Sequence, residues 1–167
     1  NAKALYLFPT KALAQDQVAE LLELNRAGDL GVKAFTFDGD TPGDARQAIR
    51  LHGDIVVSNP DMLHQGILPN HVKWVKLFEN LKYVVIDEIH AYRGVFGSNL
   101  ANVIRRLKRI CDFYGASPTF ICCSATIRNP KELAETMIGR SVRLIDENGA
   151  PAGERHVVFY NPPVVNA

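Results

Sequence analysis

The sequence is poor in cysteine, and its three cysteines do not form a metal-binding pattern. Cys122 and Cys123 are adjacent, Cys111 stands alone, and no two cysteines are separated by two residues. Structural zinc sites usually need such closely spaced pairs, and an odd number of cysteines does not make a disulfide framework. The sequence therefore argues against both, and we expect buried thiols in a reducing compartment.

Long apolar runs and an excess of charge are also missing. No apolar run is long enough to span a bilayer, and the first residues lack the basic-then-apolar order of a signal peptide. We therefore expect a cytoplasmic protein with no membrane partner. The 19 Lys and Arg residues balance 18 Asp and Glu residues to a net charge of +1. This balance neither indicates nor excludes nucleic acid, because a basic stripe can lie within a neutral total.

The 167 residues fit one domain, and a content of 47% hydrophobic and 22% charged residues is typical of a globular chain. Short apolar runs alternate with helical patterns, which predicts an α/β domain with a mainly parallel central sheet flanked by helices. The expected strands are residues 4–8, 33–37, 55–58, 83–86 and 119–123, with a further β stretch at 141–145. The strand at 83–86 should be interior and parallel to those at 55–58 and 119–123.

Helices are expected between these strands. The first ends near Gly28, the second closes before Gly115, and the third begins after Asn129 as N-cap and ends at Gly139. We expect Trp74 to anchor its own helix rather than to stack on a base. Residues 146–153 are a polar turn before residues 156–160, and residues 161–167 read as an extended linker.

Two adjacent acids, Asp87 and Glu88, follow the apolar run at 83–86. A strand without polar alternation is covered on both faces, and open α/β sheets bind ligands at the carboxyl ends of such strands. In nucleotide hydrolases the first acid of such a pair holds Mg²⁺ through water, and the second orients or deprotonates the attacking water. A pair of exposed acids that opens a turn is an equally common alternative, so the pair alone leaves both interpretations open.

Segments with known counterparts surround this pair in a fixed order. Asp87, Glu88, Ile89 and His90 are similar to motif II of DEAH-type helicases. The other matches are residues 8–17 to motif Ia, residues 38–41 to a glycine-containing nucleic-acid contact, residues 58–63 to motif Ib, and Ser124, Ala125 and Thr126 to motif III. The ordered set resembles the first RecA-like domain of superfamily 2 DEAD/DEAH-box helicases, which has a P-loop NTPase fold.

This resemblance implies ATP and Mg²⁺ as cofactors. It implies that Asp87 and Glu88 are catalytic, that Asp87 holds Mg²⁺ through water, and that His90 joins them at the nucleotide. Ser124, Ala125 and Thr126 would couple the nucleotide state to the grip on nucleic acid, with hydroxyls near Asp87 or His90.

The resemblance also implies contacts to a nucleic-acid backbone. The expected contact residues are Pro9, Thr10, Lys11, Gly39, Asp40, Ser58, Asn59 and Pro60. Thr10 and the Ser58–Asn59–Pro60 run lie at strand-to-helix junctions, where free N–H groups can bind phosphate. Ser58 or Asn59 capping a helix that begins at Pro60 is the plainer alternative, and both can hold together.

A narrower resemblance extends past motif II. Residues 90–99 and 102–107 look like the corresponding stretch of bacterial helicases of the MrfA/YprA type, which are linked to DNA repair. This implies that DNA is favoured over RNA as the partner.

The sequence contains no Gly-Lys dipeptide, although a Walker A loop needs one to hold the phosphates of ATP. The resemblance places that loop before motif Ia. We therefore interpret residues 1–160 as a partial RecA-like ATP-binding domain, which works with a Walker A segment and a second RecA-like domain of a larger helicase. Two alternatives are a metal-dependent hydrolase or nuclease that uses Asp87 and Glu88 directly, and a degenerate RecA-like nucleic-acid-binding module without ATP hydrolysis.

The chain by itself is expected not to hydrolyse ATP and to bind nucleic acid only weakly. Hydrolysis needs a phosphate cradle and compensating cations, whereas Asp87 and Glu88 alone repel the triphosphate. Phosphate release with Mg²⁺-ATP and single-stranded DNA, and fluorescence anisotropy at two salt concentrations, measure both properties. DNA-stimulated release that disappears in Glu88→Gln would contradict the expectation.

Overall fold

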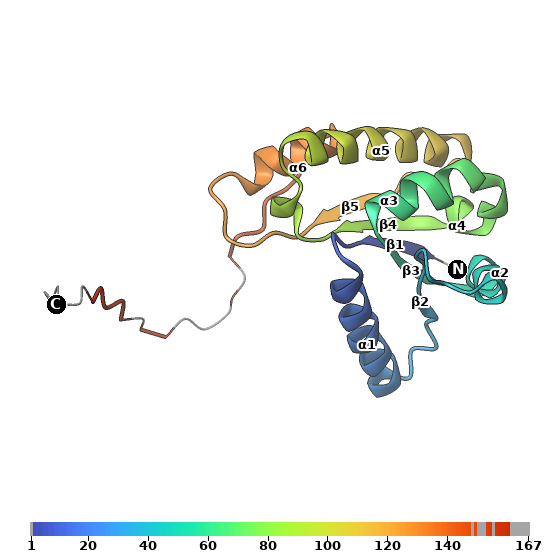
Figure 1. Ribbon diagram of the computed structural model, residues 1–167, viewed down its shortest axis with the longest axis horizontal. Coiled ribbons are helices and arrows are strands. Elements are labelled where there is room, and N and C mark those ends of the chain that lie inside the picture. The colour runs from blue at the N-terminus through green and yellow to red at the C-terminus, as the bar shows by residue number, and fades with distance from the viewer. Residues whose placement is uncertain (1, 148, 150–152, 155, 161–167) are drawn as a thin grey trace, which may run out of the picture.

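The computed structural model describes residues 2–147, 149, 153–154 and 156–160. The predicted linker at residues 161–167 lies outside them, as does part of the predicted turn at 146–153. The described chain contains a sheet of five strands: β1 (Lys3–Leu7), β2 (Ala34–Thr36), β3 (Ile55–Ser58), β4 (Leu81–Ile86) and β5 (Thr119–Cys122). Their order across the sheet is β2-β3-β1-β4-β5, and every neighbouring pair is parallel (Figure 1).

β1 lies at the centre of this sheet. Leu5 of β1 is in register with Val56 of β3 on one side and with Val84 of β4 on the other. Leu5, Val56 and Val84 are buried, as expected for parallel strands covered on both faces. β4 is interior and parallel to both β3 and β5, which confirms the predicted fold class and the predicted place of the strand at 83–86.

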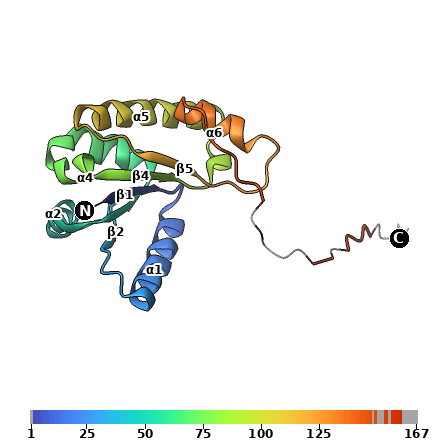
Figure 2. The ribbon, with the colours of Figure 1, turned by 180° about the vertical axis from the view of Figure 1, so that it is seen from behind.

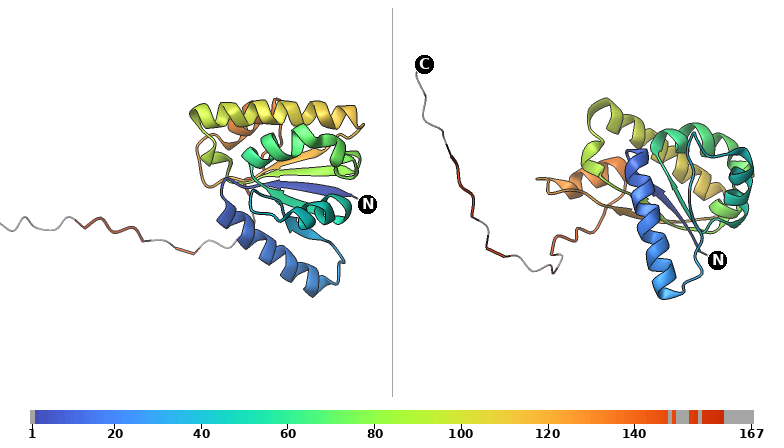
Figure 3. Two further views of the ribbon diagram at one scale, coloured as in Figure 1. Left: turned by 45° about the vertical axis from the view of Figure 1, so that its right-hand side comes forward. Right: turned by 60° about the horizontal axis from the view of Figure 1, so that its bottom comes forward.

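Helices cover both faces of the sheet, as Figures 1, 2 and 3 show from four sides. The main helices are α1 (Lys11–Gly28), α2 (Gly43–His52), α3 (Pro60–Met62), α4 (Val75–Glu79), α5 (Gly94–Phe113) and α6 (Pro130–Ile138). A π-helical turn (Leu63–Ile67) and a 3₁₀ segment (Leu68–Lys73) connect α3 to α4, and a 3₁₀ turn (Ile89–Ala91) precedes α5. α1 lies on one face, and α3, α4 and α5 lie on the other.

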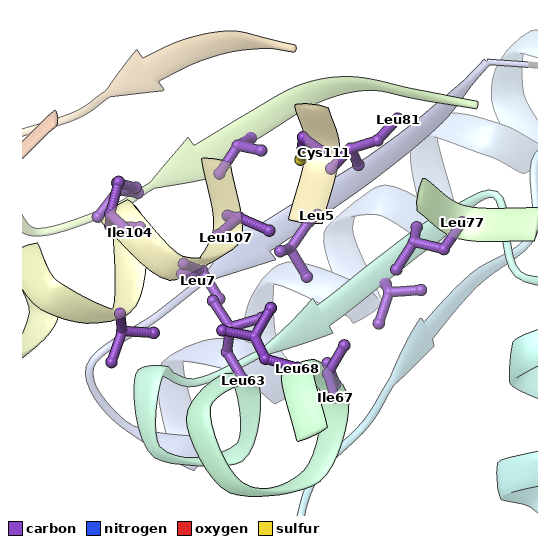
Figure 4. Close-up of a cluster of buried hydrophobic side chains, with 14 of the residues drawn as sticks. Leu5, Leu7, Leu63, Ile67, Leu68, Leu77, Leu81, Ile104, Leu107 and Cys111 are labelled. Atoms are coloured by element: carbon purple, nitrogen blue, oxygen red, sulfur yellow. The ribbon is translucent and has the colours of Figure 1, made fainter. Parts of the chain in front are cut away.

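The main core fills the space between the sheet and the α5 face. Leu5 and Leu7 of β1 meet Leu107 of α5, and the turns after α3 complete the cluster (Figure 4). Trp74 is fully buried, with its ring edge-on to Phe37 at 4.7 Å between centroids. Trp74 thus anchors the start of α4, as predicted. A smaller cluster of Phe8, Val57 and Ala14 packs under α1, which holds that helix against the opposite face.

Most predicted helix ends agree with the structure. α1 ends at Gly28, α5 ends before Gly115, and α6 ends at Gly139, whose φ of 69° is the left-handed conformation that glycine adopts without strain. Asn129 precedes α6, but its side chain does not cap the helix. It donates instead to a Glu132 carboxylate oxygen at 3.0 Å. No pattern had predicted α2, whose first turn follows Pro42.

The predicted β stretch at 141–145 is wrong. These residues form no strand, and Leu144 and Ile145 are 42% and 80% exposed. A strand is stabilised by pairing and packing rather than by β-branched residues alone, and no strand in the described part of the chain pairs with this segment. Residues 156–160 also form no strand. Of the helices in the described residues, none is both long and apolar enough to cross a bilayer.

Leu107→Ala should lower the free energy of unfolding by about 2–5 kcal/mol, because it opens a cavity in the core. Leu107 is 0% exposed, whereas Leu24 of α1 is 58% exposed and provides a matched Leu→Ala control within a helix. Urea denaturation followed by circular dichroism measures both variants. A loss below about 1 kcal/mol for Leu107→Ala, or an equal loss for Leu24→Ala, would contradict this core.

Candidate functional site

The segments singled out in the sequence meet at one edge of the sheet. Because all five strands are parallel, their carboxyl ends lie together, on the left of Figure 1. The two acids follow β4, Ser124–Ala125–Thr126 follows β5, and Thr10 follows β1. The loop at 38–41 follows β2, and Asn59 follows β3. Sheet topology thus brings every predicted site segment to the edge where α/β proteins bind ligands.

The two acids extend the hydrogen-bonding ladder beyond the end of β4. The Asp87 N–H donates to the Leu7 carbonyl at 3.0 Å, and the Glu88 N–H donates to Asp87 Oδ1 at 2.9 Å. Glu88 has φ 52° and ψ 43°, a left-handed conformation that costs a non-glycine residue about 1–2 kcal/mol. The Glu88 carboxylate lies against the ring of His90, two residues further along the chain.

His90 links the loop after β4 to the loop after β5. Its Nε2 lies 3.0 Å from Glu88 Oε2, and its Nδ1 accepts from the Ala125 N–H at 3.1 Å. A ring nitrogen that accepts an N–H carries no proton, so the hydrogen bond from Ala125 assigns the tautomer with its proton on Nε2. The Ala125 amide therefore orients the ring that lies against the Glu88 carboxylate.

This contact differs in kind from the predicted one. We expected hydroxyls of Ser124 or Thr126 near Asp87 or His90, but the group that reaches His90 is a backbone amide. The Ser124 hydroxyl donates instead to the Ala125 carbonyl at 2.8 Å, within its own loop, and Thr126 is exposed. No side-chain pattern could have revealed the amide, because every residue except proline carries one.

Neutral groups surround Asp87. Burial is the largest cause that raises the pKa of the Tyr6 hydroxyl, the Tyr92 hydroxyl and the Cys123 thiol, and the negative charge of Asp87 raises each of them further. All three groups are therefore uncharged near neutral pH. They do not neutralise the carboxylates, so the negative field at Asp87 and Glu88 favours a cation there.

The carboxylate pair does not belong to a larger set of protein ligands. Within the described ranges, no group of three or more His, Cys, Asp or Glu side chains could hold a metal ion. An ion held directly by an all-protein ligand set, as in many hydrolases and nucleases, does not fit this arrangement. A single carboxylate that shares an ion with water and phosphate oxygens does fit, and this is the usual environment of Mg²⁺.

The segments after β1 and β2 that are predicted to contact nucleic acid form a second exposed area at the same edge. The Thr10 hydroxyl accepts from the Leu13 N–H at 3.4 Å and caps α1, and Pro9 before it is half-buried. Lys11 is the first residue of α1, and its Nζ lies 2.6 Å from Asp40 Oδ2. Gly39 and Asp40 are both exposed. Four of the eight predicted contact residues, Thr10, Lys11, Gly39 and Asp40, therefore present accessible groups.

The sequence did not reveal the role of Arg46 in α2, which holds the loop at 38–41. Its guanidinium donates to the carbonyls of Asp38 at 3.1 Å, Gly39 at 3.1 Å and Thr41 at 2.8 Å. It also lies over the Phe37 ring, 5.3 Å from the centroid. Only a prediction of α2 would have shown that this arginine follows the loop by one helical turn.

The residues after β3 face the interior more than expected. Ser58 is 2% exposed, and its hydroxyl donates to the Phe37 carbonyl at 2.6 Å. Asn59 is half-buried and caps α3 by accepting from the Met62 N–H at 2.8 Å, while Pro60 is buried. Capping of a helix that begins at Pro60 is confirmed for Asn59. The Ser58 hydroxyl ties β3 to the end of β2 and is not presented to solvent.

The sequence of this chain matches a helicase family model and several ATP-dependent helicases. A family model described as DEAD/DEAH box helicase matches residues 1–133. The chain is 66% identical over 164 residues to the uncharacterized ATP-dependent helicase YprA of Bacillus subtilis, covering 98% of this chain and 22% of that protein. It is 43% identical over 170 residues to the ATP-dependent helicase hrq1 of Schizosaccharomyces pombe, covering 99% of this chain and 16% of that protein. The chain therefore spans about a fifth of the length of these relatives.

Solved structures agree with the sequence comparison. The DUF1998 helicase MrfA, in a crystal structure with DNA and AMPPNP, superposes with a TM-score of 0.95 at 65% identity, covering 99% of this chain and 23% of that chain. The DEAD-box helicase Mss116, bound to single-stranded RNA and UDP-BeF, gives a TM-score of 0.66 at 22% identity over 84% of this chain and 28% of that chain. The second match shows a shared fold, and it confirms the predicted RecA-like class.

The hydrogen bond from the Ala125 N–H to His90 Nδ1 predicts the tautomer of His90. In ¹⁵N-labelled protein above the titration range of histidine, long-range ¹⁵N–¹H correlations should show a protonated Nε2 and an unprotonated Nδ1 for His90. His52, which is exposed, provides the solvent reference. Exchange of the Ala125 N–H should also be slower than that of Thr126. A protonated Nδ1 at His90 would show that the link to Ala125 is absent.

Proposed function

Because the chain belongs to the DEAD/DEAH box helicase family, we propose that it supplies part of the motor core of an ATP-dependent DNA helicase or translocase. In this proposal it acts with two further parts of the same enzyme: a Walker A segment that cradles the triphosphate and a second RecA-like domain. The chain contributes the segments after β1, β3, β4 and β5 as motifs Ia, Ib, II and III. The relatives that it matches are themselves named ATP-dependent helicases.

The observation that carries this proposal is the position of His90, whose Nε2 lies 3.0 Å from Glu88 Oε2 and whose Nδ1 accepts a hydrogen bond from the Ala125 N–H. A carboxylate that orients and deprotonates water must be held within reach of that water. The His90 ring, 3.0 Å from Glu88 Oε2, limits the positions that this carboxylate can take. Because Ala125 holds the other ring nitrogen, a shift of the loop after β5 alters the position of the Glu88 carboxylate.

Asp87 has the complementary role in this mechanism. Its Oδ1 accepts the Glu88 N–H, which fixes the carboxylate at the end of β4, where it would hold Mg²⁺ through water. When bound, Mg²⁺ supplies the positive charge that stabilises the phosphoryl oxygens as charge develops. The neutral Tyr6 and Cys123 nearby leave the charge of Asp87 available to such an ion.

The exposed groups after β1 and β2 suit a nucleic-acid backbone. Lys11 carries a full positive charge, and the N–H groups at the start of α1 carry partial positive charges. Gly39 has no side chain, so a strand can approach the backbone of its loop closely. These are contacts to phosphate and sugar, which do not depend on base sequence. We favour DNA as the bound strand because the MrfA structure, 65% identical over this chain, was solved with DNA.

Two other functions receive less support. A nuclease or hydrolase that holds its metal with protein ligands alone would need more His, Asp or Glu groups than the described residues bring to Asp87. A degenerate binding module without ATP hydrolysis would have no need to hold Glu88 in a left-handed conformation against His90. The strained backbone of Glu88 and its contact with His90 suit a site in which Glu88 activates water.

Glu88→Gln in the full-length enzyme should leave ATP binding within about threefold of wild type and lower the ATPase rate by at least about a hundredfold. The amide keeps the size of the side chain but can no longer take a proton from water. Phosphate release measured with saturating single-stranded DNA, and separately with RNA of the same sequence, gives the rate and the preferred strand.

Glu79→Gln serves as the matched control, since Glu79 is an exposed residue at the end of α4, at the other edge of the sheet. It should hydrolyse ATP at the wild-type rate. Near-wild-type hydrolysis by Glu88→Gln would rule out Glu88 as the water-activating residue. Stronger stimulation by RNA than by DNA would reverse the proposed strand preference.

A further inference from the structure

Asp40 is a negative charge placed among the groups that should attract phosphate. Its Oδ2 lies 2.6 Å from Lys11 Nζ, and the side chains of Lys11 and Asp40 are 50% and 82% exposed. The pair joins segments 29 residues apart in the sequence, the first turn of α1 and the loop after β2. An acidic side chain adds nothing to phosphate binding, so its presence here needs an explanation other than contact with the strand.

The loop that carries Asp40 is held in place by bonds that do not involve the Asp40 carboxylate. Arg46 binds the carbonyls of Asp38, Gly39 and Thr41. The buried Asp38 accepts from the Asp40 N–H at 2.9 Å and from the Thr41 hydroxyl at 3.2 Å. The carboxylate of Asp40 is thus presented to Lys11 by a loop that stays ordered when that carboxylate is changed.

The contact shifts the pKa of both side chains in the direction that favours their charged forms. The hydrogen bond to Asp40 is the main cause that raises the pKa of Lys11, and the hydrogen bond to Lys11 is the main cause that lowers the pKa of Asp40. Asp38 adds a weaker attraction for Lys11. Both members of the pair are charged at neutral pH, and both remain accessible to solvent and to a ligand.

We propose that Asp40 sets the affinity of this edge for nucleic acid. Its carboxylate pairs with the Lys11 ammonium in the free protein, and a backbone phosphate must displace the carboxylate in order to bind Lys11. This inference rests on the proposed function and revises one part of it, since Asp40 becomes a competitor of the strand rather than a contact to it. An exposed pair of this kind is weak and screened by salt, so a phosphate can replace the carboxylate readily. The competition keeps binding reversible, as a motor that releases its strand in each cycle requires.

Asp40→Asn in the full-length enzyme should therefore tighten binding to single-stranded DNA by about fivefold at about 0.1 M salt, because a phosphate no longer has to displace the carboxylate from Lys11. The log–log plot of affinity against salt should also become steeper by roughly 0.7, the value for one additional neutralised phosphate on a single strand. Fluorescence anisotropy with a labelled oligonucleotide at four salt concentrations, without nucleotide, measures both quantities.

Glu23→Gln provides the matched control. Glu23 is an exposed residue of the same helix, three turns beyond Lys11, and its substitution changes the net charge by the same amount. It should alter the affinity by less than about twofold at about 0.1 M salt, because Glu23 lies about 18 Å from Lys11 along the helix axis, beyond the Debye length of about 10 Å at that salt concentration. An equal gain in Glu23→Gln would show that net charge alone is responsible and would overturn the proposal.

A double-mutant cycle with Lys11→Ala tests the mechanism. Lys11→Ala should weaken binding, and adding Asp40→Asn to it should give a clearly smaller gain than in the wild-type background, because the carboxylate then has no ammonium to occupy. An unchanged or weaker affinity in Asp40→Asn, while Lys11→Ala still weakens binding, overturns the inference and leaves the proposed function intact. No binding of DNA or RNA by the wild-type enzyme overturns both.

Discussion

The rest of this structure depends on the parallel pairing of β1 between β3 and β4. Leu5 and Leu7 of β1 are buried against both neighbours and against the core beneath α5. Parallel strands run in one direction, so the chain leaves each of them at the same edge of the sheet. Without that pairing, the acids after β4 and the residues after β1 would be separate features of the sequence with no shared location.

Backbone hydrogen bonds carry this order beyond the strands and into the site. Asp87 bonds to the Leu7 carbonyl, and the Ile89 N–H bonds to the Cys123 carbonyl at 2.9 Å. Glu88 lies between these two fixed points, and that constraint offsets the cost of its left-handed backbone. The arrangement of the two acids is therefore held mainly by main-chain bonds, while His90 adds a side-chain link between the loops after β4 and β5.

The carboxylates at this edge have different roles because their surroundings differ. Asp87 and Glu88 are half-buried, beside neutral hydroxyl and thiol groups, so their charge is available to a cation. Asp38 is buried, and its carboxylate accepts hydrogen bonds from an N–H and a hydroxyl of its own loop. Asp40 is almost fully exposed and pairs with Lys11. In the proposed function, burial and hydrogen bonding decide which acid binds the metal ion, which orders a loop and which competes with phosphate.

The sequence alone determined most of the elements and the residues at the strand ends, because hydrophobic periodicity and strand-end residues are local properties. The apolar run before Asp87, the helix end at Gly139 and the order of the motif segments were all predictable from it. The tertiary structure decided the contacts that link distant segments: the amide of Ala125 at His90, the clamp of Arg46 and the pairing of Lys11 with Asp40. It also buried Ser58 and left residues 141–145 without a strand. These outcomes depend on which neighbour a residue meets, and neither propensity nor spacing along the chain contains that information.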